Sequence, residues 1–556
     1  MDISRRGRSS RQSRRSPLLS LRTGGALLVT AGLLISGCSS GSSAAGAQLV
    51  ALPHSTPPEL APYYAQKLSW HDCGVPGFQC ASMKVPLDYK KPGAGDIKLA
   101  VARKRATGET DKADGKGAGK GAGRADAGTR DAGKSGGGRL GSLLVNPGGP
   151  GGSAIGYLQS YAALGYPAEV RARYDMVAVD PRGVARSEPV TCLDGAKMDA
   201  YTQTDVTPDD RRETEELRAS YQRFAAGCQK HSATVLPHVS TVEAARDMDV
   251  LRAALGDDKL SYVGASYGTF LGATYAGLYP ERVGRLVLDG AMDPALPARR
   301  MNRDQTAGFE TAFQSFAKDC VARGAECPLG SGSPEDAGKR LKSFFRGLDA
   351  KPLATGDTSH RKLGEALATT GVIAAMYDEG AWAQLRAALT SAIKNKEGAG
   401  LLALSDSYYE RDGDGTYGNL MFANAAVNCL DLPPAFTSPD GVRNALPDFE
   451  KASPVFGEGL AWSSLNCAYW PVKATGEPHR IKAEGAAPIV VVGTTRDPAT
   501  PYRWAKSLAS QLSSGRLLTY DGDGHTAYGR GSECIDSTIN AYLLEGTAPE
   551  DGKRCS

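Results

Sequence analysis

After about residue 140, two kinds of segment alternate along most of the chain, and they differ in the spacing of their apolar residues. Short β-branched runs predict buried strands, and several of the stretches between them have helical spacing. The expected strands are residues 142–145, 176–179, 260–263, 285–288, 488–492 and 517–520. The expected helices include 241–255, preceded by the capping-box pattern Ser240-x-x-Glu243, and 502–512, which follows Pro501. Strands separated by helices favour an α/β fold with a mainly parallel sheet.

This alternation stops between about residues 296 and 480, where the spacing is mostly helical. Helices are expected at 305–320, 336–348 and 382–393. A helical stretch inside an α/β chain predicts an inserted lid domain. With 556 residues the chain can form a large core and such an insertion. We therefore assign residues 70–295 and 481–556 to the core and 296–480 to the lid.

Residues 107–139 form a segment rich in Gly, Ala, Lys and Asp with almost no large apolar side chain. Such a segment cannot offset the entropy lost on ordering, so we expect it to be disordered. Strand-like runs at 97–101 and 140–145 flank it, which favours an enlarged hairpin connection. The alternative is a tether between domains, but only about 30 ordered residues would precede it, too few for a stable domain.

The N-terminus has the features of an export signal, which we assign to residues 1–37. Seven arginines precede or flank an uncharged apolar stretch at 26–35 that is too short to span a bilayer. The stretch ends in Leu34-Ile35-Ser36-Gly37-Cys38, which resembles a bacterial lipobox. We expect an acylated Cys38 and a tether at 38–69, placing the protein on the outer face of the cell membrane or secreting it. The alternative is a simple secretory signal with an incidental cysteine.

The basic excess of the chain belongs to this signal. The whole chain carries +4, but its first 22 residues hold seven Arg and one Asp, so the remainder carries −2. A nearly neutral mature protein lacks the electrostatic footprint of a nucleic-acid-binding protein. We therefore exclude nucleic acid as a partner and expect membrane contact only through the lipid anchor.

Ten cysteines remain beyond Cys38, and an even number fits an oxidising compartment. Their spacing lacks C-x-x-C, which favours structural disulfides over a metal or redox site. The sequence leaves the connectivity open. Proximity alone suggests Cys73–Cys80, Cys192–Cys228, Cys320–Cys327, Cys429–Cys467 and Cys534–Cys555.

The strongest chemical signal is Gly264-Ala265-Ser266-Tyr267-Gly268, a G-x-S-x-G pattern between a predicted strand and a helix. A serine at a sharp strand-to-helix turn has strained backbone angles, and flanking glycines let the turn close. The helix N-terminus then stabilises a developing anion. With 67 glycines in the chain the pattern can arise by chance, so the flanking strand and helix make it specific. We predict Ser266 as a nucleophile.

A serine nucleophile needs a base, and the base needs an orienting acid. Of the seven histidines, His525 lies directly after the last predicted strand, in Asp521-Gly522-Asp523-Gly524-His525. Asp497 follows the strand at 488–492 and completes the order Ser, Asp, His. Asp289, at the end of the strand at 285–288, is the competing acid, because the acid can also follow the strand before the one at 488–492.

Backbone amides must also stabilise the oxyanion of a tetrahedral intermediate. The glycine-rich loop Asn146–Gly152 follows the predicted strand at 142–145. We expect the Tyr267 amide as one donor and the Gly149 amide as the other, with Gly148 as the alternative. The loop lacks the Gly-Lys-Ser/Thr ending of a phosphate-binding loop. We expect no metal and no organic cofactor.

Together these segments resemble the tripeptidyl aminopeptidase-like branch of the α/β-hydrolases, relatives of the prolyl iminopeptidases. The matching segments are Val85–Tyr89, Asn146–Gly152, Val179-Asp180-Pro181-Arg182-Gly183-Val184, Gly264–Gly268, Asp497-Pro498 and Gly524-His525. They span nearly the whole mature chain; one departure is Ala185, where many relatives have glycine. The resemblance implies an α/β-hydrolase fold with a helical lid and a serine peptidase that releases short peptides from free N-termini. Arg182 is expected to hold its loop.

An exopeptidase of this kind must neutralise the desolvated ammonium of its substrate, so acids should project from the lid. Asp431, in Asn428-Cys429-Leu430-Asp431, matches a lid motif of the family and is the candidate; the other reading is a loop acid beside a disulfide. Two further functions stay open: a carboxylesterase or lipase, and a lipoprotein that only binds a ligand on a hydrolase scaffold. We expect a monomer.

Overall fold

The structure is a computed structural model that describes residues 47–108 and 138–556. The predicted signal peptide, Cys38 and nearly all of the segment predicted to be disordered lie outside the described residues. Within the described part of the chain, every helix is too short or too polar to cross a lipid bilayer.

A single mixed sheet forms the centre of the core, with the strand order β1-β2-β3-β5-β4-β6-β7-β8-β9-β10. The first three strands and the β3–β5 pair are antiparallel, and β5, β4 and β6 to β10 are parallel. This is the α/β-hydrolase arrangement that was predicted. The strands are β1 (His71–Asp72), β2 (Gln79–Pro86), β3 (Asp96–Lys104), β4 (Gly141–Asn146), β5 (Tyr174–Val179), β6 (Leu260–Ala265), β7 (Val283–Asp289), β8 (Ile489–Arg496), β9 (Gly515–Asp523) and β10 (Lys553–Cys555).

All six predicted core strands are present; five of them include their whole predicted range, and β8 begins one residue later than predicted. Their side chains alternate between two apolar layers, one on each face of the sheet. In β8, Val491 belongs to the layer under α7 (Thr241–Leu255), α8 (Tyr267–Leu278) and α18 (Tyr502–Gln511), whereas Val490 and Val492 belong to the layer under α2 (Ala154–Tyr157), α4 (Ala168–Arg173) and α19 (Glu533–Glu545). Burial on both faces explains why these strands read as continuous apolar runs.

The predicted helix at 241–255 is present with those bounds, but its capping box is only half formed. The Ser240 hydroxyl accepts a hydrogen bond from the Glu243 amide at 3.3 Å. The Glu243 carboxylate lies 3.5 Å from the buried Arg182 guanidinium instead of returning to Ser240. A tertiary charge partner therefore replaces the local contact that the pattern predicts.

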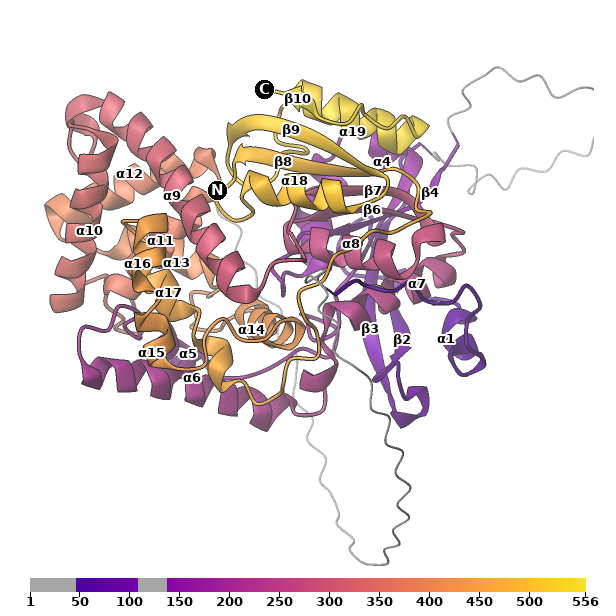
Figure 1. Ribbon diagram of the computed structural model, residues 1–556, viewed down its shortest axis with the longest axis horizontal. Helices are drawn as coiled ribbons and strands as arrows, with labels where there is room; N and C mark the ends of the chain where they lie inside the picture. The colour runs from indigo at the N-terminus through magenta and orange to yellow at the C-terminus, as the bar shows by residue number, and fades with distance from the viewer. Residues whose placement is uncertain (1–46, 109–137) are drawn as a thin grey trace, which may run out of the picture. The chain divides into compact units, whose positions relative to one another are not determined.

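The lid contains the three predicted helices and has its own apolar core. Its elements are α9 (Ala298–Ala322), α10 (Pro334–Ala350), α11 (Glu365–Met376), α12 (Trp382–Thr390), α13 (Ala399–Tyr408), α14 (Leu420–Asp431), α15 (Pro439–Arg443), α16 (Leu446–Ala452) and α17 (Gly457–Ser463). In Figure 1 most of them lie to the left of the sheet, and α14 lies below β8 and β9.

The predicted boundaries of the lid miss one part of it. Helices α5 (Gly195–Thr202) and α6 (Arg211–Ser232) are inserted after β5, and Figure 1 places them beside α15. Leu217 and Tyr221 of α6 share an apolar cluster with Phe449 and Trp462. The lid is therefore built from two insertions that are distant in sequence.

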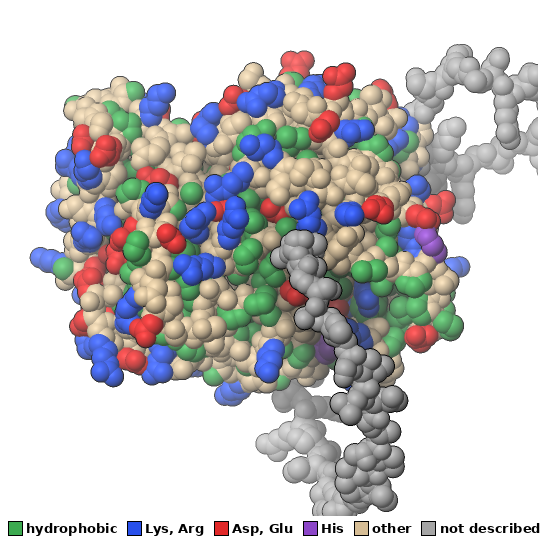
Figure 2. Space-filling model, in the orientation of Figure 1, with side chains coloured by type: hydrophobic (Ala, Val, Ile, Leu, Met, Phe, Trp, Pro, Cys, Tyr) green, Lys and Arg blue, Asp and Glu red, His purple; other side chains and the backbone are tan. Residues whose placement is uncertain are grey.

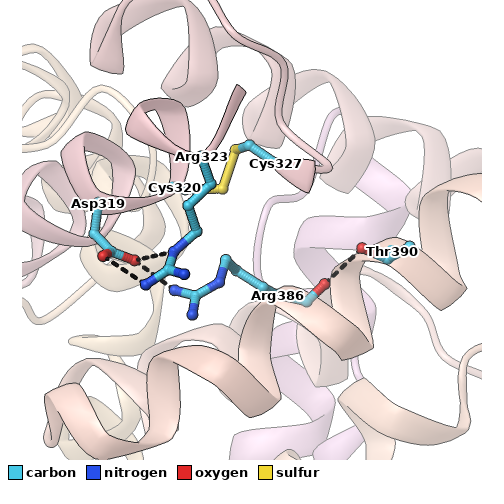
Figure 3. The surroundings of a disulfide bond; sticks show 6 residues. All are labelled: Asp319, Cys320, Arg323, Cys327, Arg386 and Thr390. Carbon is cyan, nitrogen blue, oxygen red and sulfur yellow. Dashed lines mark hydrogen bonds and ion pairs between the residues drawn. A yellow bond between two sulfur atoms is a disulfide. The ribbon is translucent and has the colours of Figure 1, made fainter. Parts of the chain in front are cut away.

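The structure contains the five disulfides suggested by proximity, with the same pairing. Figure 3 shows how one of them organises the lid. Cys320–Cys327 closes the end of α9, and next to it the Asp319 carboxylate accepts hydrogen bonds from Arg323, at 3.1 Å, and from Arg386 of α12. The bridge and the ion pairs together join α9 to α12.

The described part of the predicted tether belongs to the core. The Leu49 amide donates to the Arg480 carbonyl at 3.1 Å, and the Leu52 amide donates to the Leu278 carbonyl at 2.9 Å. In α1 (Ala61–Tyr64), the Tyr64 hydroxyl donates to Asp249 at 2.7 Å. Apolar contacts at these positions make residues 49–64 part of the packed structure, so the prediction of a tether up to residue 69 is too long.

Candidate active site

Ser266 stands at the bend between β6 and α8, with φ 56° and ψ −124°. A positive φ at a non-glycine residue is strained and is held only by its surroundings. The Ser266 amide donates to the Asp289 carbonyl at 2.8 Å. A Cβ atom at Gly264 would lie 2.4 Å from the Gly268 carbonyl oxygen, and one at Gly268 would lie 2.8 Å from the Asn146 carbonyl oxygen. The two motif glycines are therefore required for the bend.

The structure brings His525 and Asp497 together. His525 Nδ1 lies 2.9 Å and 3.0 Å from the two carboxylate oxygens of Asp497. This carboxylate also accepts hydrogen bonds from the amides of Ala499, Thr500 and Thr526, at 2.9, 2.8 and 3.2 Å, and its residue is only 2% exposed. An ionised acid at Nδ1 fixes the proton on that nitrogen and leaves Nε2 as an acceptor.

His525 Nε2 is buried and has no hydrogen-bond partner among the described residues. The ring lies over the end of β7, because a Cβ atom at Gly290 would be 3.2 Å from His525 Cε1. Gly290 directly follows Asp289, whose carbonyl holds the Ser266 amide. The imidazole and Ser266 therefore share the carboxyl edge of β6 and β7. Since Nδ1 is held by Asp497, Nε2 is the ring nitrogen left to accept a proton from a hydroxyl.

Of the two acids that the sequence offered, Asp497 is the one that contacts the imidazole. The Asp289 carboxylate instead accepts hydrogen bonds from the amides of Ala527 and Tyr528, at 3.0 and 2.9 Å. Burial raises the pKa of Asp289 above its usual value. Its contacts hold the loop that follows His525, so its position is a structural one.

The glycine-rich loop lies against the bend that carries Ser266. Gly148 and Gly149 have φ values of 96° and 113°. A Cβ atom at Gly148 would lie 2.8 Å from the Tyr267 amide nitrogen and 2.9 Å from Ser266 Cβ, so only glycine fits there. The Gly148 amide already donates to the Asn146 side chain at 2.9 Å. Of the two predicted loop donors, the Gly149 amide is therefore the better placed to serve an oxyanion with the Tyr267 amide.

Asp431 ends α14 in the lid, as predicted, but its carboxylate has internal partners. Its Oδ1 accepts from the Thr241 amide at 2.8 Å, and its Oδ2 accepts from the Thr241 hydroxyl. The residue is 8% exposed, and burial raises its pKa to about 7. The Thr241 hydroxyl also bonds the Tyr267 hydroxyl. These contacts give Asp431 a role in joining the lid to the residue after Ser266, and give no support to the predicted ammonium contact.

Three residues near the base carried no signal in the sequence. The Tyr377 carbonyl, in the lid after α11, accepts from the His525 amide at 2.9 Å. The Tyr377 ring meets the imidazole edge-on, at 5.4 Å between ring centroids. Arg530 donates to the His525 carbonyl at 2.6 Å and pairs with Asp378 at 3.1 Å. None of the three lies in a motif, so only the tertiary structure reveals them.

One cluster of potential metal ligands exists among the described residues: Asp88, His238 and Glu243. The buried Arg182 guanidinium lies 3.5 Å from the Glu243 carboxylate and would repel a cation there. Arg182 also binds Asp247 through two hydrogen bonds of 2.7 Å and donates to the carbonyls of Leu87 and His238. These contacts hold its loop, and we assign no metal to the cluster.

Comparison with known proteins completes the description of the site. A family model described as TAP-like protein matches residues 453–555, which include Asp497 and His525, and one described as alpha/beta hydrolase fold matches residues 141–326, which include Ser266. The serine protease Hip1 of Mycobacterium tuberculosis is 36% identical over 524 residues, covering 89% of this chain and 92% of the relative. The chain belongs to the TAP-like α/β-hydrolases.

Two further relatives bear different names. Carboxylesterase B of Mycobacterium tuberculosis is 36% identical over 511 residues, covering 89% of this chain and 91% of that protein. The tripeptidyl aminopeptidase of Streptomyces coelicolor is 31% identical over 492 residues, covering 86% of this chain and 84% of that protein. As a TAP-like α/β-hydrolase with relatives of these kinds, the protein is a serine hydrolase of the peptidase type.

Proposed function

We propose that this protein is an exported serine aminopeptidase that releases short peptides or single residues from free N-termini. The observation that carries the proposal is the Asp497–His525 pair, whose buried Nε2 lacks a partner at the edge of the sheet that Ser266 occupies. The relative named tripeptidyl aminopeptidase, at 31% identity, supports the choice of substrate.

In the proposed reaction the Ser266 hydroxyl attacks the carbonyl carbon of the scissile peptide bond while His525 Nε2 takes its proton. The ionised Asp497 stabilises the imidazolium. The amides of Tyr267 and Gly149 donate to the oxyanion. The imidazolium then protonates the leaving amine, the carbon–nitrogen bond breaks, and an acyl-enzyme remains. Water, deprotonated by His525, cleaves this ester and restores the Ser266 hydroxyl.

The second candidate is a carboxylesterase, which the relative named carboxylesterase B supports at the same 36% identity as the protease. Both candidates use the same catalytic atoms and differ in the pocket that receives the substrate. Peptidyl anilides with a free amine, their acetylated twins and acyl nitrophenyl esters separate the two. A peptidase cleaves the free peptide much faster than the acetylated one, whereas an esterase prefers the esters and ignores the amine.

The variant Ser266→Ala tests the shared chemistry. It should lose fluorophosphonate labelling, and its kcat should fall by about 10⁶-fold, as for other triad serines. Unchanged thermal unfolding is the control for folding. Hydrolysis that survives in Ser266→Ala would contradict both candidates, and a protein that is labelled and cleaves the esters but not the free peptidyl anilides would contradict the aminopeptidase alone.

We also propose that the protein is held at the outer face of the membrane through an acylated Cys38. The lipobox-like sequence before Cys38 supports this. In cells of a bacterium that processes lipoproteins, the wild-type chain should partition into the detergent phase and Cys38→Ser into the aqueous phase. Equal partitioning of the two chains would contradict acylation and leave the catalytic proposal untouched.

A further inference from the structure

Three arginines converge on one buried carboxylate at the start of the lid. Asp304 of α9 is 1% exposed; its carboxylate lies 2.7 Å from Arg503 of α18, 3.0 Å from Arg303 and 3.9 Å from Arg300. The side chains of the three arginines remain 43% to 63% exposed. One carboxylate neutralises only one of three cations, so the cluster holds a fixed excess of positive charge at the surface.

More cations surround this cluster. Arg299 lies next to Arg300 in the first turn of α9 and is 51% exposed. Its acidic contact is the exposed Asp448, at 3.7 Å. Lys506 follows Arg503 by three residues on α18 and is also exposed. In Figure 2, Lys and Arg side chains gather over α9 and α18 on the face that the view presents. We call Arg299, Arg300, Arg303, Arg480, Arg503 and Lys506 the basic face.

Backbone contacts connect the basic face to the point where the described chain begins. The Arg480 amide donates to the Ala47 carbonyl at 2.8 Å. The neighbouring His479 amide donates to the Pro294 carbonyl at 3.0 Å, four residues before α9 begins at Ala298. The exposed Arg480 is therefore next to Ala47, and the chain that leads back to Cys38 starts beside this face.

We propose that the basic face docks on the anionic phospholipids of the membrane surface. Eight residues lie between Cys38 and Ala47, and such a chain reaches about 30 Å at most, so a lipid on Cys38 would hold this face close to the headgroups. Lysines and arginines near an anionic surface each strengthen binding by about fivefold. The net charge of −2 beyond residue 22 does not reveal the basic face, because a sum over the chain does not show a local excess of positive charge. The sequence led us to expect membrane contact only through the lipid anchor, and the proposal adds the basic face as a second contact.

Vesicle binding of the full chain tests the proposal. The wild type is sedimented with vesicles of phosphatidylglycerol and phosphatidylcholine at 3:7, and with phosphatidylcholine alone. We expect preference for the anionic vesicles, weakening as KCl rises because salt screens exposed charges. The variant Arg299→Gln/Arg480→Gln/Lys506→Gln, which keeps the contacts of Asp304, should bind the anionic vesicles about 100-fold more weakly.

A second variant covers the arginine cluster itself. Arg300→Gln/Arg303→Gln/Arg503→Gln is combined with Asp304→Asn, so that no carboxylate is left buried without a partner. It loses a net two positive charges, which predicts about 25-fold weaker binding. The matched control removes three exposed lysines elsewhere in the lid, Lys339→Gln/Lys351→Gln/Lys362→Gln, and should bind like the wild type.

All chains share the basic N-terminus, so only differences between variants report on the basic face. Equal thermal unfolding and equal fluorophosphonate labelling show that the variants are folded. Equal binding to both vesicle types, full binding by both variants, or the same loss in the lid control would overturn the proposal. A chain that binds the vesicles but has no peptidase activity would refute the proposed function and leave the basic face standing.

Discussion

The main-chain amide of His525 donates a hydrogen bond of 2.9 Å to the carbonyl oxygen of Tyr377, which joins the proposed base directly to the lid. A second connection runs through Arg530, which binds the His525 carbonyl and pairs with Asp378, the residue after Tyr377. Both polar groups of the His525 backbone are therefore held, one by the lid and one by an arginine that the lid holds in turn. The position of the imidazole depends on that of the lid.

This connection predicts that Arg530 acts as a positioning residue. Arg530→Ala should lower kcat by about 10- to 100-fold with little change in KM, because small displacements of a base are costly while substrate contacts remain. Steady-state kinetics on a free peptidyl anilide measure both constants. Arg530→Lys, which keeps a donor and the charge, should restore part of the activity. An unchanged kcat in Arg530→Ala would show that the Tyr377 contact alone holds the base.

Replacement by asparagine should affect kcat differently at Asp497 and at Asp289. Asp497→Asn should lower kcat by about 10⁴-fold, because an amide at Nδ1 favours the wrong imidazole tautomer. It should also destabilise the protein, because three backbone amides donate to this buried carboxylate. Asp289→Asn should destabilise the protein by about 1 to 3 kcal/mol, because a buried acceptor for two amides is weakened, but it should leave kcat nearly unchanged, because Asp497 is the acid at the imidazole. Kinetics and thermal unfolding of both variants compare the two effects. The reverse pattern would make Asp289 the acid.

The sequence predicted the parts of the site that local backbone geometry dictates. Gly264 and Gly268 are required by the bend at Ser266, and the buried strand β8 leads to Asp497, so both positions are readable from the pattern. The contact of Tyr377 with His525 joins residues far apart in sequence through ordinary backbone groups, which leave no motif. The same limit applies to α6, whose packing against Trp462 makes it part of the lid. Asp431 matched a motif, but motifs do not specify partners, and its partner is Thr241.

The contacts of Asp431 predict that it does not recognise the amine of the substrate. Both carboxylate oxygens are occupied by Thr241, and an asparagine can keep both contacts. Asp431→Asn should therefore leave the ratio of kcat/KM for free and acetylated peptidyl anilides unchanged. Measuring the two substrates side by side with wild type and variant checks this. A collapse of the ratio towards one would assign the ammonium contact to Asp431 after all.

Asp431 also predicts how stability depends on pH. Its pKa is about 7 in the folded protein and near 3.8 when exposed, so between these values the folded state binds a proton that the unfolded state lacks. The free energy of unfolding should therefore fall as pH rises from about 4 to 7, with a slope of up to about 1.4 kcal/mol per pH unit from this group. Above pH 7 this contribution should be constant.

Asp431→Asn isolates that contribution from those of Glu243 and Glu365, whose pKa values are also raised to about 7 by burial. These two carboxyl groups titrate in both chains, so their slope cancels in the difference between wild type and variant. Urea unfolding at pH 5, 6, 7 and 8, with the disulfides intact, should show the wild type losing about 2 to 3 kcal/mol relative to the variant between pH 5 and 8. Parallel curves would mean that Asp431 ionises as it would in water, and that its burial beside Thr241 is offset by contacts stronger than those described.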